Sequence, residues 1–254
     1  MPDPVTPTAI VTGAGAGIGR TLSVMFARHG ANVVCCGRRA NLLDETVALI
    51  EAEGANGLAV PTDITDRDQV RRMVDAALER FGAIDILFNN AGSFWCIGAV
   101  WEVDPQAWWA DVTVNLLGSF LTMHEVLPHM MANDSGIIIN MNGGKPPGGS
   151  GYGSSKAGFM ELSKTLVAEL QQADSNVLVF TAGPGLVRTE MTEFQAADAA
   201  GQKWIPSVGE MLDAGQVRDP QEIAEATIKM VQVARPELNG MKYGPGMDFS
   251  EFEE

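Results

Sequence analysis

The chain has 254 residues, of which 46% are hydrophobic and 19% charged, and its formal net charge is −15. This composition is that of a globular protein with one large or two small domains. The negative charge would repel a polyanion, so nucleic acid is not an expected partner. No apolar run approaches the ~18 residues of a membrane span, and no basic segment precedes an apolar one at the N-terminus. We therefore expect a cytoplasmic protein that does not bind a membrane.

Short apolar segments rich in Val and Ile alternate with longer amphipathic segments along the chain. This alternation predicts an α/β fold in which a parallel sheet carries helices on both faces. No linker and no repeat divides the chain, so we expect a single domain over 1–254. The segments expected as strands are 8–12, 31–36, 57–60, 84–90, 136–141 and 176–181, and the clearest helices are 17–29 and 66–81.

The region from about 186 to 219 interrupts the alternation of strands and helices, because Gly and Pro divide its helix-like segments. A long insertion of this kind is often a substrate lid or a binding loop. A regular helix then restarts at Pro220, a residue that suits the first turn.

A glycine-rich run, "TGAGAGIGR", joins the first expected strand to the first expected helix. Its glycines (Gly13, Gly15, Gly17 and Gly19) allow a tight turn and a close approach of the backbone to a pyrophosphate. The free N–H groups and the positive end of the helix dipole would then bind the anion. The alternative, an ordinary flexible turn, is weakened by the strand before it and the helix after it.

A second stretch, "GGSGYGSSK", places Tyr152 four residues before Lys156. Residues i and i+4 share one face of a helix, so both side chains can point into one cleft. A neighbouring ammonium favours the phenolate and lowers a tyrosine pKa from its ordinary value of ~10. Such a tyrosine can exchange a proton with a hydroxyl or a carbonyl while a nicotinamide exchanges a hydride. A surface pair of Tyr and Lys is the alternative.

Together these motifs resemble the short-chain dehydrogenase/reductase family. "TGAGAGIG" is similar to its glycine loop, "NNAG" at 89–92 to its second signature, and "GPGLVRTEM" at 183–191 to its PGxxxT segment. Tyr152 and Lys156 match its YxxxK pair, and Asn115 matches its helical asparagine. The resemblance runs from about Thr8 to Met191, and it implies a Rossmann-type, doubly wound sheet of about seven parallel strands.

The resemblance also implies roles for single residues. Lys156 would bind the nicotinamide ribose as well as assist Tyr152, Asn115 would hold a water in a proton relay, and Asp63 would contact the adenine. A polar residue that kinks a helix is the alternative for Asn115, and a helix cap, for which Asp66 competes, is the alternative for Asp63. The expected cofactor-binding residues are Gly13, Gly15, Gly17, Ile18, Gly19, Arg38, Arg39, Asp63, Ile64, Asn90, Ala91, Gly92, Tyr152, Lys156, Pro184, Gly185, Val187 and Thr189.

The sequence departs from the family at the catalytic serine, which the family places about thirteen residues before the tyrosine. Gly143 falls at that position, and only nine residues separate it from Tyr152. The nearest side chain able to donate a hydrogen bond is Asn142, whose amide could replace the hydroxyl. We therefore expect Asn115, Asn142, Tyr152 and Lys156 to form the catalytic set, with no metal ion.

The end of the second expected strand, "VVCCGRR", bears on the choice of cofactor. A carboxylate there would accept the ribose hydroxyls of NAD, but Gly37 takes its place and Arg38 and Arg39 follow. Two guanidinium groups favour a 2′-phosphate, so NADP(H) is the expected cofactor and NAD(H) is possible. The alternative is that both arginines are solvated and NAD binds loosely.

The expected substrate pocket is apolar, because its candidate residues are Phe94, Trp95, Met191 and Trp204. These could instead belong to the core or to a subunit contact. We predict a ketoreductase that interconverts a ketone and a secondary alcohol on a bulky, mostly apolar or aromatic small molecule. A dehydratase or isomerase on the same fold, or a cofactor-binding protein with weak catalysis, remains open. By resemblance, the protein would be a homodimer or homotetramer through helices at about 105–131 and 152–172, with Phe159, Leu162, Leu166 and Leu170 in the contact.

Overall fold

The computed structural model describes residues 6–252 and contains one sheet of seven parallel strands. Its strand order is β3-β2-β1-β4-β5-β6-β7, the doubly wound arrangement that the sequence predicts. The six expected strands are all present, two with the expected bounds and four with bounds that differ by one or two residues. The seventh, β7, has only two residues. The strands are β1 (Thr8–Thr12), β2 (Asn32–Gly37), β3 (Gly57–Pro61), β4 (Ile86–Asn89), β5 (Gly136–Met141), β6 (Val177–Ala182) and β7 (Lys242–Tyr243).

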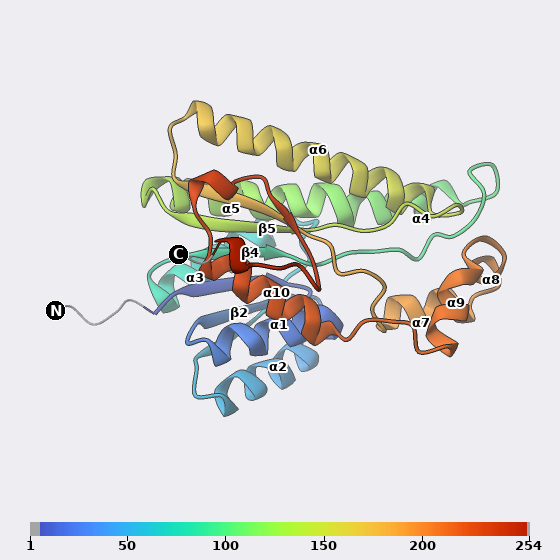
Figure 1. The fold of residues 1–254 in the computed structure, drawn as a ribbon, viewed down its shortest axis with the longest axis horizontal. Helices are drawn as coiled ribbons and strands as arrows, with labels where there is room; N and C mark the ends of the chain where they lie inside the picture. Colours follow the sequence, from blue (N-terminus) through green and yellow to red (C-terminus); the bar gives the residue numbers. More distant parts are fainter. Residues whose placement is uncertain (1–5, 253–254) are drawn as a thin grey trace.

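Helices cover both faces of the sheet (Figure 1). One apolar cluster packs α1, α2 and α10 against one face, and a second packs α3, α5 and α6 against the other. Each strand from β1 to β6 is apolar on both sides because both faces are covered. These helices are α1 (Gly17–Arg28), α2 (Ala40–Ala52), α3 (Arg67–Phe81), α5 (Ser119–Ala132), α6 (Ser150–Gln172) and α10 (Pro220–Gln232).

The expected central helix at 105–131 is continuous but changes its winding in the middle. α4 (Pro105–Val112) leads into a π-helical segment, Thr113–Gly118, which leads into α5. A π-helical turn inside an α-helix is rare and is often found at functional sites. This one contains Asn115.

The insertion forms three short helices, α7 (Glu190–Ala197), α8 (Ala199–Trp204) and α9 (Pro206–Asp213). Figure 1 shows them as a lobe beyond one end of the sheet. Within residues 6–252, none of the helices is long and apolar enough to cross a membrane. The outer limits of the predicted domain, 1–5 and 253–254, lie outside the described residues.

The face of α6 that the sequence assigns to subunit contacts is used inside the protein. Phe159, Leu166 and Leu170 are 0%, 7% and 2% exposed, and they belong to the cluster that packs against the sheet. That assignment is wrong for these residues, because helical periodicity identifies an apolar face but not its partner.

Candidate active site

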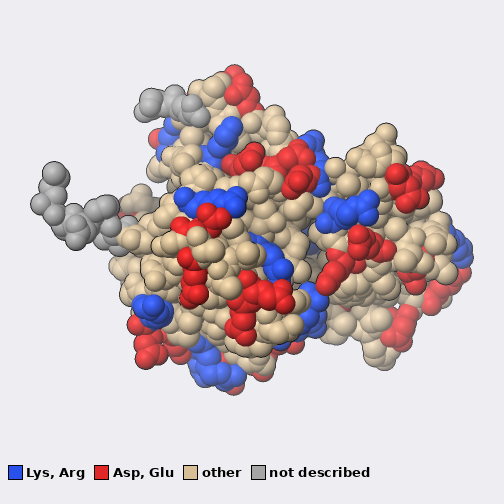
Figure 2. Space-filling model, turned by 90° about the horizontal axis from the view of Figure 1, so that it is seen from below, with Lys and Arg blue, Asp and Glu red and all other residues tan. Residues whose placement is uncertain are grey.

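A cavity of about 1400 Å³ lies at the carboxyl ends of the central strands. Parallel sheets of this order bind ligands at this edge, where the strand order reverses between β1 and β4. Figure 2 shows a hollow between the body of the molecule and the lobe at the right, with acidic and basic side chains at its rim. The expected site residues that line the cavity are Gly13, Gly15, Gly17, Ile18, Arg38, Arg39, Asp63, Ile64, Asn90, Ala91, Gly92, Phe94, Trp95, Asn142, Tyr152, Lys156, Pro184, Gly185, Val187, Thr189 and Met191.

The glycine-rich loop is held close to the loop after β4. The hydroxyl oxygen of Thr12 accepts hydrogen bonds from the backbone N–H groups of Asn90 and Ala91, both at 3.0 Å. A Cβ atom at Gly13 would lie 2.9 Å from the Asn90 amide nitrogen, and Gly13 has a φ of +69°. A Cβ atom at Gly19 would overlap the backbone of Gly13, so Gly19 permits tight packing and does not line the cavity.

The N-terminus of α1 is open toward this cavity. Its N-cap residue, Ala16, makes no side-chain hydrogen bond to the first turn. Free N–H groups at a helix start favour an anion. A glycine cradle beside an uncapped helix therefore fits the pyrophosphate of a dinucleotide, and the residues around it would hold such a cofactor.

The part of the cavity where the sequence predicts the adenosine of the cofactor lies at the end of β2. Gly37, Arg38 and Arg39 line the cavity there, together with Asp63. Asp66 caps α3 by accepting from the N–H groups of its first turn, so the cap role is not that of Asp63. The carboxylate of Asp63 instead accepts from the backbone and the hydroxyl of Thr65, at 3.0 and 2.8 Å.

Tyr152 and Lys156 lie on the first two turns of α6 and face the same cavity. The Lys156 Nζ atom is 5.8 Å from the centroid of the Tyr152 ring and donates to the Met141 carbonyl at 2.8 Å. Burial lowers the pKa of Lys156 to about 8. Burial, with a smaller contribution from the Asp111 carboxylate, raises the pKa of Tyr152 to about 12. The net shift is opposite to the lowering that the sequence predicts, because desolvation of the phenolate dominates.

The position of the missing serine is filled by the tyrosine itself. A Cβ atom at Gly143 would overlap the Tyr152 hydroxyl and would lie 2.6 Å from Cζ of the ring. The shortened loop thus brings the backbone of Gly143 against Tyr152 and leaves no room for a side chain. Asn142 lines the cavity beside it, and its Oδ1 atom accepts from the Gly143 N–H at 2.8 Å.

Asn115 lies behind the cavity and does not line it. Its side chain is fully buried, and its amide group donates to the Ser93 carbonyl at 2.7 Å and to the Ser155 hydroxyl at 3.1 Å. Its oxygen accepts from the Ser93 N–H at 2.8 Å. One amide hydrogen is therefore bonded to the chain after β4 and the other to α6, which leaves one acceptor lone pair for the expected water relay.

A buried carboxylate that sequence reasoning missed supports the same segment. Asp111 is 1% exposed, lines the cavity, and accepts from the Ser93 hydroxyl. It also accepts from the backbone N–H groups of Trp95 and Cys96, at 3.1 and 2.9 Å. The sequence could have identified Asp111, because it lies four residues before Asn115 and so on the same face of the helix.

The other end of the cavity is apolar. The buried Phe94 ring stacks on Tyr152, with centroids 4.5 Å apart and planes 7° apart. Trp95 makes an edge contact with Phe194 of α7 at 4.8 Å, and Met191 of the same helix lines the wall. Trp204, which we expected here, contacts Trp101 at 6.5 Å and does not line the cavity.

The fold and the site are those of a nicotinamide-dependent oxidoreductase. A family profile described as short chain dehydrogenase matches residues 7–200. The 3-oxoacyl-(acyl-carrier-protein) reductase FabG of Thermotoga maritima is 31% identical over 242 residues, which cover 92% of this chain and 94% of that protein. The chain belongs to the short-chain dehydrogenase/reductase family.

Solved structures of this family share the whole architecture. A short-chain dehydrogenase/reductase from Burkholderia phymatum in complex with NAD has a TM-score of 0.82 at 25% identity, over 94% of this chain and 88% of that chain. A variant of an actinorhodin polyketide ketoreductase with NADPH has a TM-score of 0.83 at 25% identity, over 94% and 95% of the two chains. Similar structures thus bind either cofactor.

Proposed function

We propose that the protein is an NADP(H)-dependent oxidoreductase that interconverts a ketone and a secondary alcohol on a bulky, mostly apolar or aromatic substrate. One observation carries the proposal. Tyr152 and Lys156 face a single cavity that has a glycine cradle at one end and an apolar wall at the other. A nicotinamide bound in this cavity would supply or accept the hydride.

The pKa of Tyr152 supports the reductive direction. Because burial raises it to about 12, the hydroxyl is protonated at neutral pH and can donate to a carbonyl oxygen. Lys156, whose pKa is lowered to about 8, is mostly charged at neutral pH. We propose that its ammonium stabilises the phenolate that forms as the proton leaves, and that the Asn142 amide donates to the substrate oxygen.

The substrate class follows from the apolar end of the cavity. Phe94, Trp95 and Met191 offer contacts to rings or alkyl chains, and apolar pockets of this kind bind such groups. The relatives named as reductases and ketoreductases support a carbonyl substrate.

The test is a panel of ketones and secondary alcohols, followed by nicotinamide absorbance with NADPH and with NADH. We expect turnover of aromatic or long-chain ketones, loss of turnover in Tyr152→Phe, and unchanged cofactor binding in that variant. A panel that gives no absorbance change although both cofactors bind would contradict the proposal.

One observation favours a second function. The backbone of Gly143 lies against Tyr152, so the site has one hydroxyl where the family has two. A single acid/base residue suits a dehydration or an isomerisation on the same fold. Conversion of a hydroxy compound without net change in the nicotinamide absorbance would identify this function.

We also propose that the protein is a cytoplasmic homodimer or homotetramer. Four large apolar side chains are more than 40% exposed along the helix that carries Asn115, and they offer a symmetric contact in place of the buried face of α6. They are Trp109, Leu117, Phe120 and Met131. Light scattering that gives a 27.0 kDa particle at micromolar concentration would refute the assembly.

A further inference from the structure

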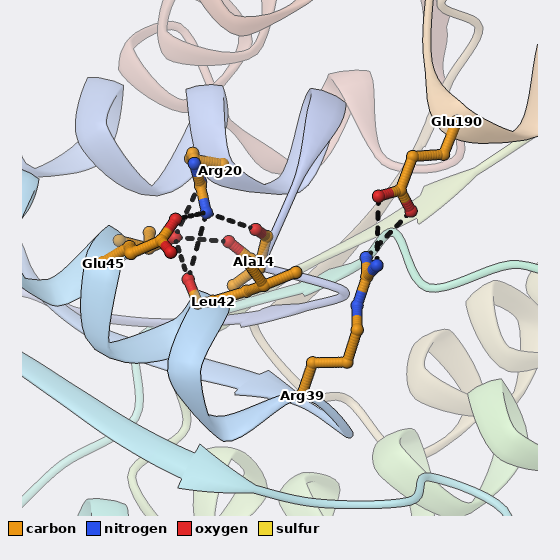
Figure 3. A network of polar contacts seen from close by, with 8 residues as sticks. Ala14, Arg20, Arg39, Leu42, Glu45 and Glu190 are labelled. Carbon is orange, nitrogen blue, oxygen red and sulfur yellow. Dashed lines mark hydrogen bonds and ion pairs between the residues drawn. The ribbon is translucent and has the colours of Figure 1, made fainter. Parts of the chain in front are cut away.

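An ion pair crosses the site between two segments that are far apart in sequence. Arg39 is the residue that precedes α2, two positions after β2 ends, and Glu190 is the first residue of α7. Both terminal nitrogens of Arg39 lie 3.0 Å from the two carboxylate oxygens of Glu190. Figure 3 shows the two side chains reaching toward each other, end to end, from opposite segments.

This pair occupies the part of the cavity where cofactor choice is expected to be made. Arg39 and Glu190 both line the cavity, as do Gly37 and Arg38. Thr189, which caps α7, lies against the glycine loop, since its methyl group would be 3.2 Å from a Cβ atom at Gly17. The start of α7 thus adjoins the cradle itself.

The guanidinium proposed for a 2′-phosphate is therefore already bound to a carboxylate. Glu190 holds the edge formed by the two terminal nitrogens of Arg39, and its negative charge offsets that of the guanidinium, so a phosphate that needs this edge competes with it. The hydrogen bond that Arg39 donates to Glu190 holds the pKa of Glu190 below the ordinary value, so this carboxylate is charged at neutral pH. Within residues 6–252, Arg38 makes neither an ion pair nor a side-chain hydrogen bond.

We infer that Glu190 is a cofactor-selectivity residue whose carboxylate competes with the 2′-phosphate of NADP(H) for Arg39. This inference rests on the proposed binding of a nicotinamide dinucleotide in the cavity. The phosphate has to take Arg39 from Glu190 before it can bind there, so Glu190 weakens NADP(H) binding. A ribose hydroxyl does not displace a carboxylate from a guanidinium, so NAD(H) leaves the pair intact.

The pair also links the two ends of the site. Glu190 begins the helix that carries Met191 and Phe194 of the apolar wall. With NAD(H) bound, α7 stays tethered to the segment after β2. With NADP(H) bound, the tether is released, so substrate affinity depends on which cofactor is present.

The experiment measures cofactor dissociation constants directly, by calorimetry, for Glu190→Gln. Glu193→Gln is the matched control, because Glu193 lies on the same helix with similar exposure but pairs with Arg188 at 3.4 Å. Glu190 is 60% exposed, so the substitution leaves the core intact. An exposed ion pair of ordinary strength predicts that NADPH binds about two- to fivefold more tightly to Glu190→Gln.

We expect no change for NADH in Glu190→Gln and no change for either cofactor in Glu193→Gln. In an Arg39→Ala background, Glu190→Gln should no longer affect NADPH binding. The inference is overturned if Glu190→Gln leaves the NADPH dissociation constant unchanged, or if the tightening persists without Arg39.

These outcomes are separate from those of the proposed function. A wild-type protein that prefers NADH, yet gains NADPH affinity in Glu190→Gln through Arg39, would support the inference and contradict the NADP(H) preference. A wild-type preference for NADPH that Glu190→Gln does not change would support the NADP(H) preference and contradict the inference. Absence of ketone turnover affects neither binding result.

Discussion

Gly143 limits the position of Tyr152, the proposed acid/base residue, and Gly143→Ala tests this limit. The new methyl group would overlap the Tyr152 hydroxyl and lie 2.6 Å from Cζ. Ordinary carbon contacts begin near 3.5 Å, so the ring must retreat by about 1 Å. Movement of the ring also disturbs its stack on Phe94.

A misplacement of this size predicts a fall in turnover of about 100-fold. Cofactor affinity should not change, because the glycine cradle lies elsewhere. Gly143→Ser should lose activity for the same reason, although it restores the residue that the family has at this position. The assay is reduction of the best ketone of the panel, with cofactor binding and thermal unfolding measured on the same samples.

Gly144→Ala is the matched control. Its new methyl group would meet nothing closer than Pro146, at 4.0 Å, so its turnover should equal that of the wild type. If Gly143→Ala retains wild-type turnover on a substrate that Tyr152→Phe does not convert, the tyrosine does not work from the position described above.

Further predictions concern the charged and polar groups around Tyr152. Asn142→Ala should lower turnover by about 100-fold if its amide donates to the substrate oxygen; full turnover would show that another donor serves. In a titration of phenolate absorbance at pH 10, the folded protein should show almost none, because burial raises the pKa of both Tyr152 and Tyr243, the only tyrosines, whereas about half should ionise in urea. Ionisation of one tyrosine near pH 10 in the folded state would contradict this. Asp111→Asn should lower the pKa of Tyr152, since its carboxylate helps to raise it, and should destabilise the fold by about 1.5–3 kcal/mol through weaker hydrogen bonds; an unchanged titration would exclude the electrostatic effect. Relative to Lys156→Met, the wild type should gain stability between pH 8 and 10.5, because the unfolded lysine still binds a proton there that the folded one has lost. Urea unfolding would measure this difference, and one that does not vary over that pH range would refute it.

The sequence predicts most of the fold because its signals are local. Six strands are apolar runs, and the glycine loop stands between a strand and a helix, so their order alone implies the sheet. The sequence does not predict β7, because a strand of two residues, Lys242 and Tyr243, shows no periodicity. The buried face of α6 was given the wrong partner, because periodicity does not identify what covers an apolar face.

In the candidate site, too, the features that depend on local spacing could be predicted, and those that depend on the packed fold could not. The Tyr152 and Lys156 pair is visible as an i, i+4 spacing, and the cavity brings them together. The pairing of Arg39 with Glu190 joins residues 151 positions apart, which no local pattern reveals. The raised pKa of Tyr152 depends on how deeply the ring is buried, and burial is a property of the packed fold.

The central place of β1 bears on how the chain folds during synthesis. β1 leaves the ribosome first, but β4, one of its two neighbours, begins only at Ile86. Until then one edge of β1, whose five residues are all buried in the finished protein, has no partner. Unpaired apolar edges of this kind promote aggregation. A nascent chain that stops before Ile86 would therefore depend on chaperones, whereas one that has passed Asn89 can pair β1 with both of its neighbours.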